Sequence, residues 1–189
     1  MRLTLPSLAG LSALLLLAAC GGGGGNSSSS APATSTPVPA TSLSYTDPTT
    51  GAFRLVKDPA SSGGTLVLDL VCTSGTPLSG VSFSFTADPA KATWTSPVTG
   101  AGSALNLGSA PLPVASKLTG GDLQGALSQK GTGSPLTPTA STVLARITLK
   151  LKGGVAPGTV TLSDSGKGAY LDGAGVHNIV VATGALSAQ

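Results

Sequence analysis

Few side chains in this sequence have the chemistry of a catalytic or metal site. His177 is the only histidine, and nucleophilic catalysis by serine needs a base such as histidine that a third group positions. No Gly-x-Ser-x-Gly motif surrounds any serine. One histidine and Cys72 cannot supply the several ligands of a zinc site. We therefore predict that the protein is not an enzyme, that it holds no metal or cofactor, and that His177 lies in a loop or near a strand start.

Two aspartates are the remaining candidates for site chemistry. Asp164 and Asp172 flank a glycine-rich segment and could lie near each other. Paired carboxylates can perform acid–base catalysis or bind calcium. Their spacing matches no EF-hand loop, so we expect exposed aspartates in turns. A calcium site near these two residues stays open as the alternative.

Trp94 and Tyr170 are the candidate binding residues, because large aromatic side chains recur at binding surfaces. For Trp94 a core tryptophan that caps the sandwich is favoured, and an exposed binding residue is the alternative. Phe83 and Phe85 alternate with polar residues and are expected in the core. The sequence has one tryptophan and two tyrosines, which leaves few rings for the flat platform on which a polysaccharide stacks.

The N-terminus has the pattern of a segment that directs export. Arg2 precedes an apolar run from Leu3 to Ala19, and Cys20 follows the run directly. A positive start, an apolar middle and small residues before a cut are typical of a secretory signal. At about 17 residues the run is at the lower limit for spanning a bilayer, so a retained membrane anchor is the alternative.

The ending Leu17-Ala18-Ala19-Cys20 resembles the lipobox of bacterial lipoproteins. The resemblance implies cleavage before Cys20 and acylation of its sulfur, with the multiple acyl chains that stable anchoring needs. Gly21 stands where many Gram-negative lipoproteins carry an aspartate that retains them in the inner membrane. The resemblance therefore implies an exported protein anchored by lipid in the bacterial cell envelope, with the outer membrane favoured.

The chain divides into three segments by composition. Residues 1–19 form the predicted signal peptide. Residues 20–42 contain the acylated cysteine and a tether rich in glycine, serine and proline, which is typical of a disordered linker. Residues 43–189 form the predicted folded domain, which is long enough to bury a core of its own.

Composition favours an all-β domain. Charged residues make up 9% of the chain and glutamate is absent, so the residues that usually cover helix surfaces are scarce. Threonine, valine and turn-forming residues suit strands and loops. The formal net charge is +3 and the basic residues are scattered, which argues against nucleic acid as a partner. Cys72 ends an apolar alternation and is expected to be buried, without a disulfide.

Alternating segments between turn signals predict the strands. Thr65–Cys72 is predicted as a central strand that is covered on both faces. In residues 143–152, the odd-numbered residues from Val143 to Leu151 are expected on one face and Leu144 on the other. Further strands are predicted at 81–86, at 159–162 and from 179, with a polar loop at 163–175 and no clear pattern at 97–140. Many short strands separated by turns indicate a sandwich or a barrel.

Several of these segments resemble cohesin modules. Val143–Lys152, Ala156–Thr159 and Val160–Ser163 are similar to the late cohesin strands, and Val81–Phe85 before Asp88-Pro89 is similar to an earlier one. The similarity runs from about residue 65 to about residue 188. It implies a two-sheet jelly-roll β-sandwich, which cohesins share with certain cellulose-binding modules, and a general binding role such as the dockerin binding of cohesins.

Three functions are compatible with the sequence. The favoured one is a non-catalytic binding or adaptor domain that contacts a dockerin-like or envelope protein. In this interpretation acylated Cys20 anchors the protein to the lipid membrane. The alternative is a carbohydrate-binding module on a lipid anchor, in which Trp94 and Tyr170 contact polysaccharide. An enzyme that uses its aspartates is the least supported.

Overall fold

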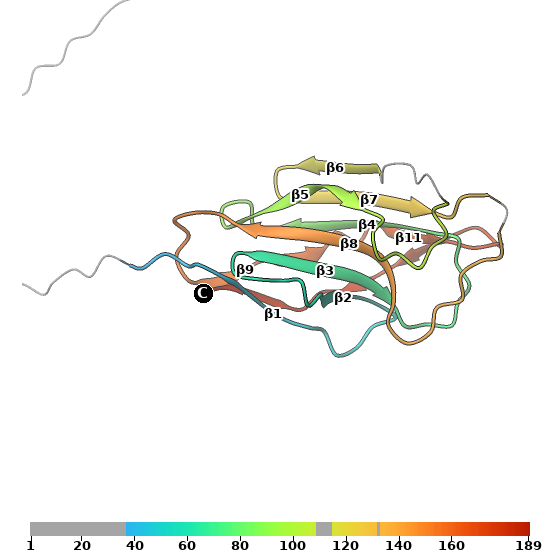
Figure 1. Cartoon of the computed structure of the whole chain (residues 1–189), viewed down its shortest axis with the longest axis horizontal. Helices are drawn as coiled ribbons and strands as arrows, with labels where there is room; N and C mark the ends of the chain where they lie inside the picture. The colour runs from blue at the N-terminus through green and yellow to red at the C-terminus, as the bar shows by residue number, and fades with distance from the viewer. Residues whose placement is uncertain (1–36, 109–114, 132) are drawn as a thin grey trace, which may run out of the picture. The chain divides into compact units, whose positions relative to one another are not determined.

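The structure is a computed structural model that describes residues 37–108, 115–131 and 133–189 (Figure 1). The predicted signal peptide, Cys20 and most of the tether lie outside these residues. No helix capable of spanning a bilayer occurs in the part of the chain that the structure describes. The strands are β1 (Leu43–Thr46), β2 (Phe53–Lys57), β3 (Thr65–Cys72), β4 (Gly80–Ala87), β5 (Ala92–Thr99), β6 (Ala115–Thr119), β7 (Asp122–Ser128), β8 (Thr142–Leu151), β9 (Gly158–Val160), β10 (Leu162–Asp164), β11 (Gly168–Leu171), β12 (Val176–Ile179), β13 (Val181–Ala182) and β14 (Ala185–Ala188).

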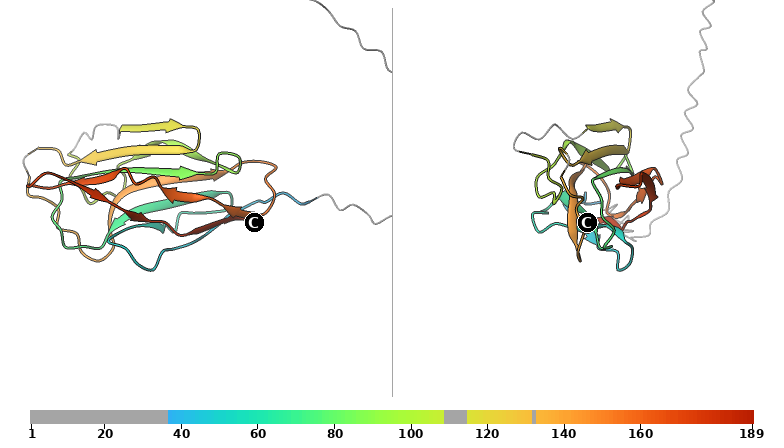
Figure 2. Two further views of the ribbon diagram at one scale, coloured as in Figure 1. Left: turned by 180° about the vertical axis from the view of Figure 1, so that it is seen from behind. Right: turned by 90° about the vertical axis from the view of Figure 1, so that its right-hand side faces the viewer.

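The strands form two large sheets and one small one. One large sheet has the order β13-β2-β3-β8-β5, and the other has the order β12-β11-β4-β7-β6 with β10 also paired to β4. The small sheet has the order β1-β14-β9. The chain passes back and forth between the large sheets, from β3 to β4, to β5, to β6 and β7, and to β8. Figure 2 shows the strands in these layers from two further sides. This is the predicted jelly-roll β-sandwich.

Alternating apolar residues form the core between the large sheets. β3 has the predicted bounds Thr65–Cys72 and pairs with β2 on one side and β8 on the other. Its residues Leu66 and Leu70 are fully buried. The rings of Phe85 on β4 and Trp94 on β5 have centroids 6.4 Å apart, so the inner faces of the two sheets meet. Burying one large apolar side chain contributes about 1.5–3 kcal/mol.

The predicted alternation of β8 is wrong at one end, because the strand contains a bulge. Leu70 of β3 pairs with Ala145, whereas the next residue, Val71, pairs with Val143. Leu144 is therefore an extra residue without a partner. It is fully buried, while Val143 is only half-buried, the reverse of the expected pattern.

Two segments without a predicted strand contribute strands to the sheet around β4. β6 and β7 lie within residues 97–140, where the sequence shows no clear pattern. β10 and β11 include residues of the segment 163–175, so the prediction of a loop there is wrong. Both pair with β4, at successive positions along it. These short polar segments become strands because β4 offers them backbone partners, which intrinsic propensity does not reveal.

The chain enters the domain beside its own C-terminal strand. The amide of Ala40 donates to the carbonyl of Val155 at 2.7 Å, and the amides of Thr41 and Ser42 donate to the carbonyl of Gln189 at 2.7 and 2.9 Å. Ala40 is buried. The fold therefore begins inside the segment that was predicted as tether, a few residues before the expected boundary.

Candidate functional site

The outward side of β4 and its neighbours is the surface best suited to contact another molecule. Opposed residues on antiparallel strands point to the same side, so the register places Ser82 beside Ala126 and Ser84 beside Gln124. Phe83, between the two serines, points into the core. We call this surface the β4 face. It comprises Ser82, Ser84 and Thr86 of β4, Asp122, Gln124 and Ala126 of β7, Lys117 and Thr119 of β6, Ala169 and Leu171 of β11, and Val176 and Asn178 of β12.

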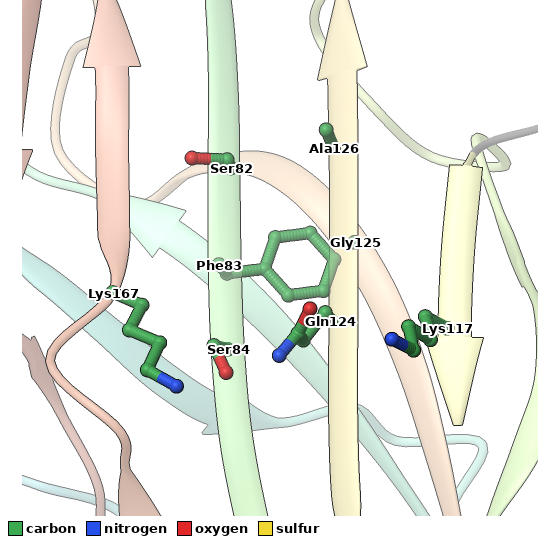
Figure 3. A pocket seen from close by; sticks show the side chains of 8 residues that line it. All are labelled: Ser82, Phe83, Ser84, Lys117, Gln124, Gly125, Ala126 and Lys167. Carbon is green, nitrogen blue, oxygen red and sulfur yellow. The ribbon is translucent and has the colours of Figure 1, made fainter. Parts of the chain in front are cut away.

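A shallow hollow of about 410 Å³ lies on the β4 face (Figure 3). Its floor consists of small residues, because Ser82 and Ser84 on β4 lie next to Gly125 and Ala126 on β7. The remaining lining residues are Phe83, Lys117, Gln124 and Lys167. A shallow, open hollow of this kind can take a side chain of a partner, whereas small-molecule sites are clefts that bury most of the ligand's surface.

The hollow depends on a close approach between Phe83 and Gly125. A Cβ on Gly125 would lie 2.5 Å from Cζ and 2.7 Å from Cε2 of Phe83, nearer than non-bonded carbon atoms approach. In Figure 3 the ring extends from β4 toward Gly125. Phe83 is 2% exposed and stacks on Phe85 with centroids 5.6 Å apart. The missing side chain at Gly125 therefore leaves room for the ring on the inner side of the sheet, beneath the hollow that both residues line.

Hydroxyl groups form the polar centre of the β4 face. The Oγ of Ser84 donates to the Oγ of Ser165 at 3.1 Å. The Oγ1 of Thr86 lies 3.2 Å from the Oγ of Ser165 and donates to Oδ1 of Asp122 at 2.6 Å. Because the hydrogen of Thr86 goes to Asp122, Ser165 donates to Thr86 in turn. This chain of hydrogen bonds connects β4 with β7 and with the segment that follows β10, so the polar centre is preorganised.

Lys117 and Lys167 stand on opposite sides of the hollow (Figure 3). Lys117 lies on β6 opposite Gln124. Lys167 follows a turn in which Oδ1 of Asp164 accepts the amide of Gly166 at 3.1 Å. Both lysines are exposed, and neither takes part in an ion pair within the described residues. None of the residues that line the hollow is acidic, so its local potential favours an anionic group.

Apolar side chains continue the β4 face beyond the hollow. Leu171 of β11 is 40% exposed, and Val176 of β12, directly opposite, is 72% exposed. Ala126 is also exposed. Apolar groups next to polar and charged ones are typical of surfaces that bind proteins reversibly.

Asp172 and His177 meet at the hairpin between β11 and β12. Oδ1 of Asp172 accepts the amides of Ala174 at 2.7 Å and Gly175 at 2.9 Å, and it lies 3.1 Å from Nε2 of His177. The hydrogen bond from Ala174 is the main cause that holds the pKa of Asp172 below its usual value. His177 is the second residue of β12, near a strand start as expected.

The hydrogen bonds of Asp164 are separate from this pair. Its carboxylate accepts the amides of Gly166 at 3.1 Å and Val181 at 2.8 Å. Both aspartates thus accept backbone amides of turns, a common role of aspartate in loops, and Asp164 also holds the first residue of β13. Both are half-buried, so the expectation that they are exposed is wrong. Across the residues that the structure describes, no three His, Cys or Asp side chains gather as potential metal ligands.

The structure buries Trp94, one of the two predicted binding residues. Trp94 is 5% exposed, and its Nε1 donates to the carbonyl of Gly121 at 2.8 Å. Trp94 is therefore a core residue, the role that the sequence favoured, and the alternative of an exposed binding residue is wrong because Trp94 falls on the inward register of β5. Tyr170 is half-buried, with its ring 6.0 Å from that of Phe53 and 4.8 Å from that of His177.

Tyr170 is the one aromatic side chain with appreciable exposure. The other rings, those of Tyr45, Phe53, Phe83, Phe85 and Trp94, are at most 7% exposed, and these six are all the aromatic residues of the sequence. The platform of several exposed rings on which the carbohydrate alternative depended is therefore not formed.

On the outward side of the other large sheet, Arg146 binds two buried carboxylates. Its Nε donates to Oδ1 of Asp69 at 2.8 Å and its terminal NH2 donates to Oδ2 of the same residue at 3.0 Å. The terminal nitrogen also contacts the carboxylate of Asp58. These partners, Asp69 first, raise the pKa of Arg146 above its usual value. Both carboxylates bind the same guanidinium, so the cluster is a structural tie between β8, β3 and the residue that follows β2.

Sequence reasoning predicted the strand on one side of the hollow but missed the other lining residues, above all Lys117, Gln124 and Lys167. Lys117 and Gln124 lie on β6 and β7, which the sequence did not reveal as strands. The alternation of Leu123, Gly125 and Leu127 was a usable signal, but the glycine interrupts its apolar series. Cys72 is buried, as predicted. Cys20 lies outside the described residues, so its acylation stays a prediction.

Similarity to known proteins is confined to the fold. No protein-family model matches the sequence, and no curated protein matches it. Among solved structures, the sixth cohesin of scaffoldin B from Acetivibrio cellulolyticus, in complex with a Cel5 dockerin, aligns at a TM-score of 0.52 and 20% identity over 72% of this chain and 97% of that one. A type II cohesin–X-dockerin complex from the same organism aligns at 0.51 and 16% identity, over 70% and 95%. The described domain has the cohesin-like fold, as the sequence resemblance implied.

Proposed function

We propose that the protein is a non-catalytic binding domain that contacts a protein partner through the β4 face. The observation that carries this proposal is the combination of a shallow hollow between Lys117 and Lys167 with exposed apolar side chains at Leu171 and Val176. A surface of this kind offers charge and shape for recognition. The residues that line the hollow include no histidine, cysteine or carboxylate.

The structural neighbours support a role in protein contact. Both aligned structures are cohesins in complexes with dockerins. A dockerin-like module is therefore one candidate partner, and another protein of the cell envelope is the second. The β4 face can serve either, since the proposal rests on its surface chemistry and not on the identity of one partner.

The proposal places this domain on a lipid anchor in the cell envelope, with the outer membrane favoured. Its support is the sequence Leu17-Ala18-Ala19-Cys20 and the glycine-, serine- and proline-rich tether after it. A flexible tether of about 20 residues spans on the order of 25 Å, which separates a domain from the lipid headgroups. The β4 face would then remain accessible to soluble partners.

Affinity capture tests the binding proposal. The full chain and two variants are used as bait for secreted and envelope proteins of the source organism. Ala126→Tyr fills the hollow with a ring, and Thr93→Tyr adds the same ring to an exposed position of β5 in the other large sheet. We expect the wild-type chain and Thr93→Tyr to capture the same protein and Ala126→Tyr to lose it. Equal capture by Ala126→Tyr would refute the β4 face as the contact surface.

Metabolic labelling tests the anchor. Cells that express the full chain are grown with an alkyne-bearing fatty acid, and the protein is recovered and coupled to a fluorophore. We expect label on the wild-type chain in the membrane fraction and no label on Cys20→Ala. A wild-type chain that carries no label would contradict the lipid anchor and leave the binding proposal to be judged by the capture experiment.

A further inference from the structure

We infer that the partner inserts an acidic side chain of a protein segment into the hollow between Lys117 and Lys167. This inference rests on the proposed function and specifies the chemistry of its partner. The first observation is the placement of the two ammonium groups, which come from β6 and from the turn between β10 and β11 and face the same hollow (Figure 3). Cations on both sides of one small depression define where a carboxylate would be held.

The two lysines differ from lysines that the fold uses for itself. Lys91 Nζ donates to the carbonyl of Thr159 at 2.5 Å, and Lys152 Nζ donates to the carbonyl of Pro89 at 2.6 Å. In the described part of the chain, Lys117 and Lys167 have no side-chain hydrogen bond or ion pair. Their donors are therefore available to a ligand.

The floor of the hollow suits a carboxylate as well. The exposed side chain of Gln124 lies between Ser84 and Lys117 in the register of the sheet. Its amide can donate to an anionic oxygen. The hydroxyl of Ser84, by contrast, is already engaged with Ser165. A carboxylate in the hollow would thus receive hydrogen bonds from two ammonium groups and one amide without disturbing the existing network.

The surroundings favour a peptide over an acidic polysaccharide. The face continues from the hollow to Ala126, Leu171 and Val176, whose exposed apolar groups can cover the apolar side chains that neighbour an acidic residue. Sugar rings stack on exposed aromatic rings, and the β4 face contains none. A protein segment in which Asp or Glu stands among apolar residues therefore matches this surface best.

Panning of a random-peptide display library on the full chain tests the inference. We expect the recovered peptides to be enriched in Asp and Glu beside apolar residues. Synthetic versions of the recovered peptides are then titrated by fluorescence anisotropy. The double variant Lys117→Gln/Lys167→Gln should weaken binding about tenfold, because an exposed ion pair contributes about twofold to fivefold. The matched control Lys57→Gln/Lys150→Gln removes the same charge from exposed positions of the other large sheet and should change affinity less than about twofold.

The outcomes separate this inference from the proposed function. Dependence on the hollow is measured as loss of peptide binding in Ala126→Tyr. If the peptides depend on the hollow but are not enriched in acidic residues, and if they bind the double lysine variant as tightly as the wild-type chain, the acidic partner is refuted and protein binding is left in place. Failure to recover any peptide that depends on the hollow would overturn both. Polygalacturonate serves as the acidic polysaccharide. If it displaces the recovered peptides and binds the wild-type chain with higher affinity than the peptides do, the assignment of a protein segment is overturned.

Discussion

Replacement of Gly125 by alanine tests how the hollow is built. The new Cβ would lie 2.5 Å from Cζ of Phe83, so the ring must move by about 1 Å to regain a normal contact of about 3.5–4.0 Å. Phe83 is buried and stacked on Phe85, and overpacking of this kind costs about 1–3 kcal/mol. Alanine recovers about 0.5–1 kcal/mol of backbone entropy relative to glycine in a strand. We expect a net loss of about 1–2 kcal/mol in the free energy of unfolding.

Urea unfolding of the full chain measures this loss. Trp94 is the only tryptophan and is buried beside Phe85, so its fluorescence reports the opening of the core. The matched control is Gly75→Ala, because a Cβ at Gly75 has no neighbour within 4 Å. The control should lie within about 0.5 kcal/mol of the wild-type chain.

A double-mutant cycle assigns the loss to the ring. Phe83→Leu removes part of the side chain that the new methyl group would meet, so Gly125→Ala should cost less in the Phe83→Leu background than in the wild-type one. The coupling free energy should be about 1 kcal/mol. Additive losses, or a Gly125→Ala variant as stable as the wild-type chain, would refute the steric account of the hollow.

Two further predictions concern the polar groups outside the hollow. Arg146→Met leaves the buried carboxylates of Asp58 and Asp69 without their cation. In urea unfolding it should lower the free energy of unfolding by about 2–4 kcal/mol, a range that allows for the partial exposure of the cluster. The control Lys150→Met on the same strand should change the free energy of unfolding little. Burial raises the pKa of Tyr45 to about 12. An ultraviolet titration should therefore show its phenol ionising near pH 12, and this absorbance change should be absent in Tyr45→Phe. Because the unfolded phenol ionises at about pH 10, stability should fall as the pH rises from about 10 to about 12 in the wild-type chain and less in Tyr45→Phe.

The sequence alone predicted the features that local pattern controls. The lack of glutamate and the abundance of threonine and valine predicted an all-β domain, and the alternation in residues 65–72 gave β3 with its bounds. Side-chain type and period-two alternation are properties of short segments, so they can be read before the fold is known.

Only the tertiary structure decided which surface the protein presents. The hollow exists because β4 and β7 pair in a register that places Phe83 opposite Gly125, and because β10 and β11 turn Lys167 toward Lys117. Trp94 is buried because β5 directs it between the sheets. Strand pairing joins segments that lie far apart in the chain, and a shift of one residue would turn every side chain of a strand to the other face. No local pattern contains that register, so the site itself became visible only in the folded domain.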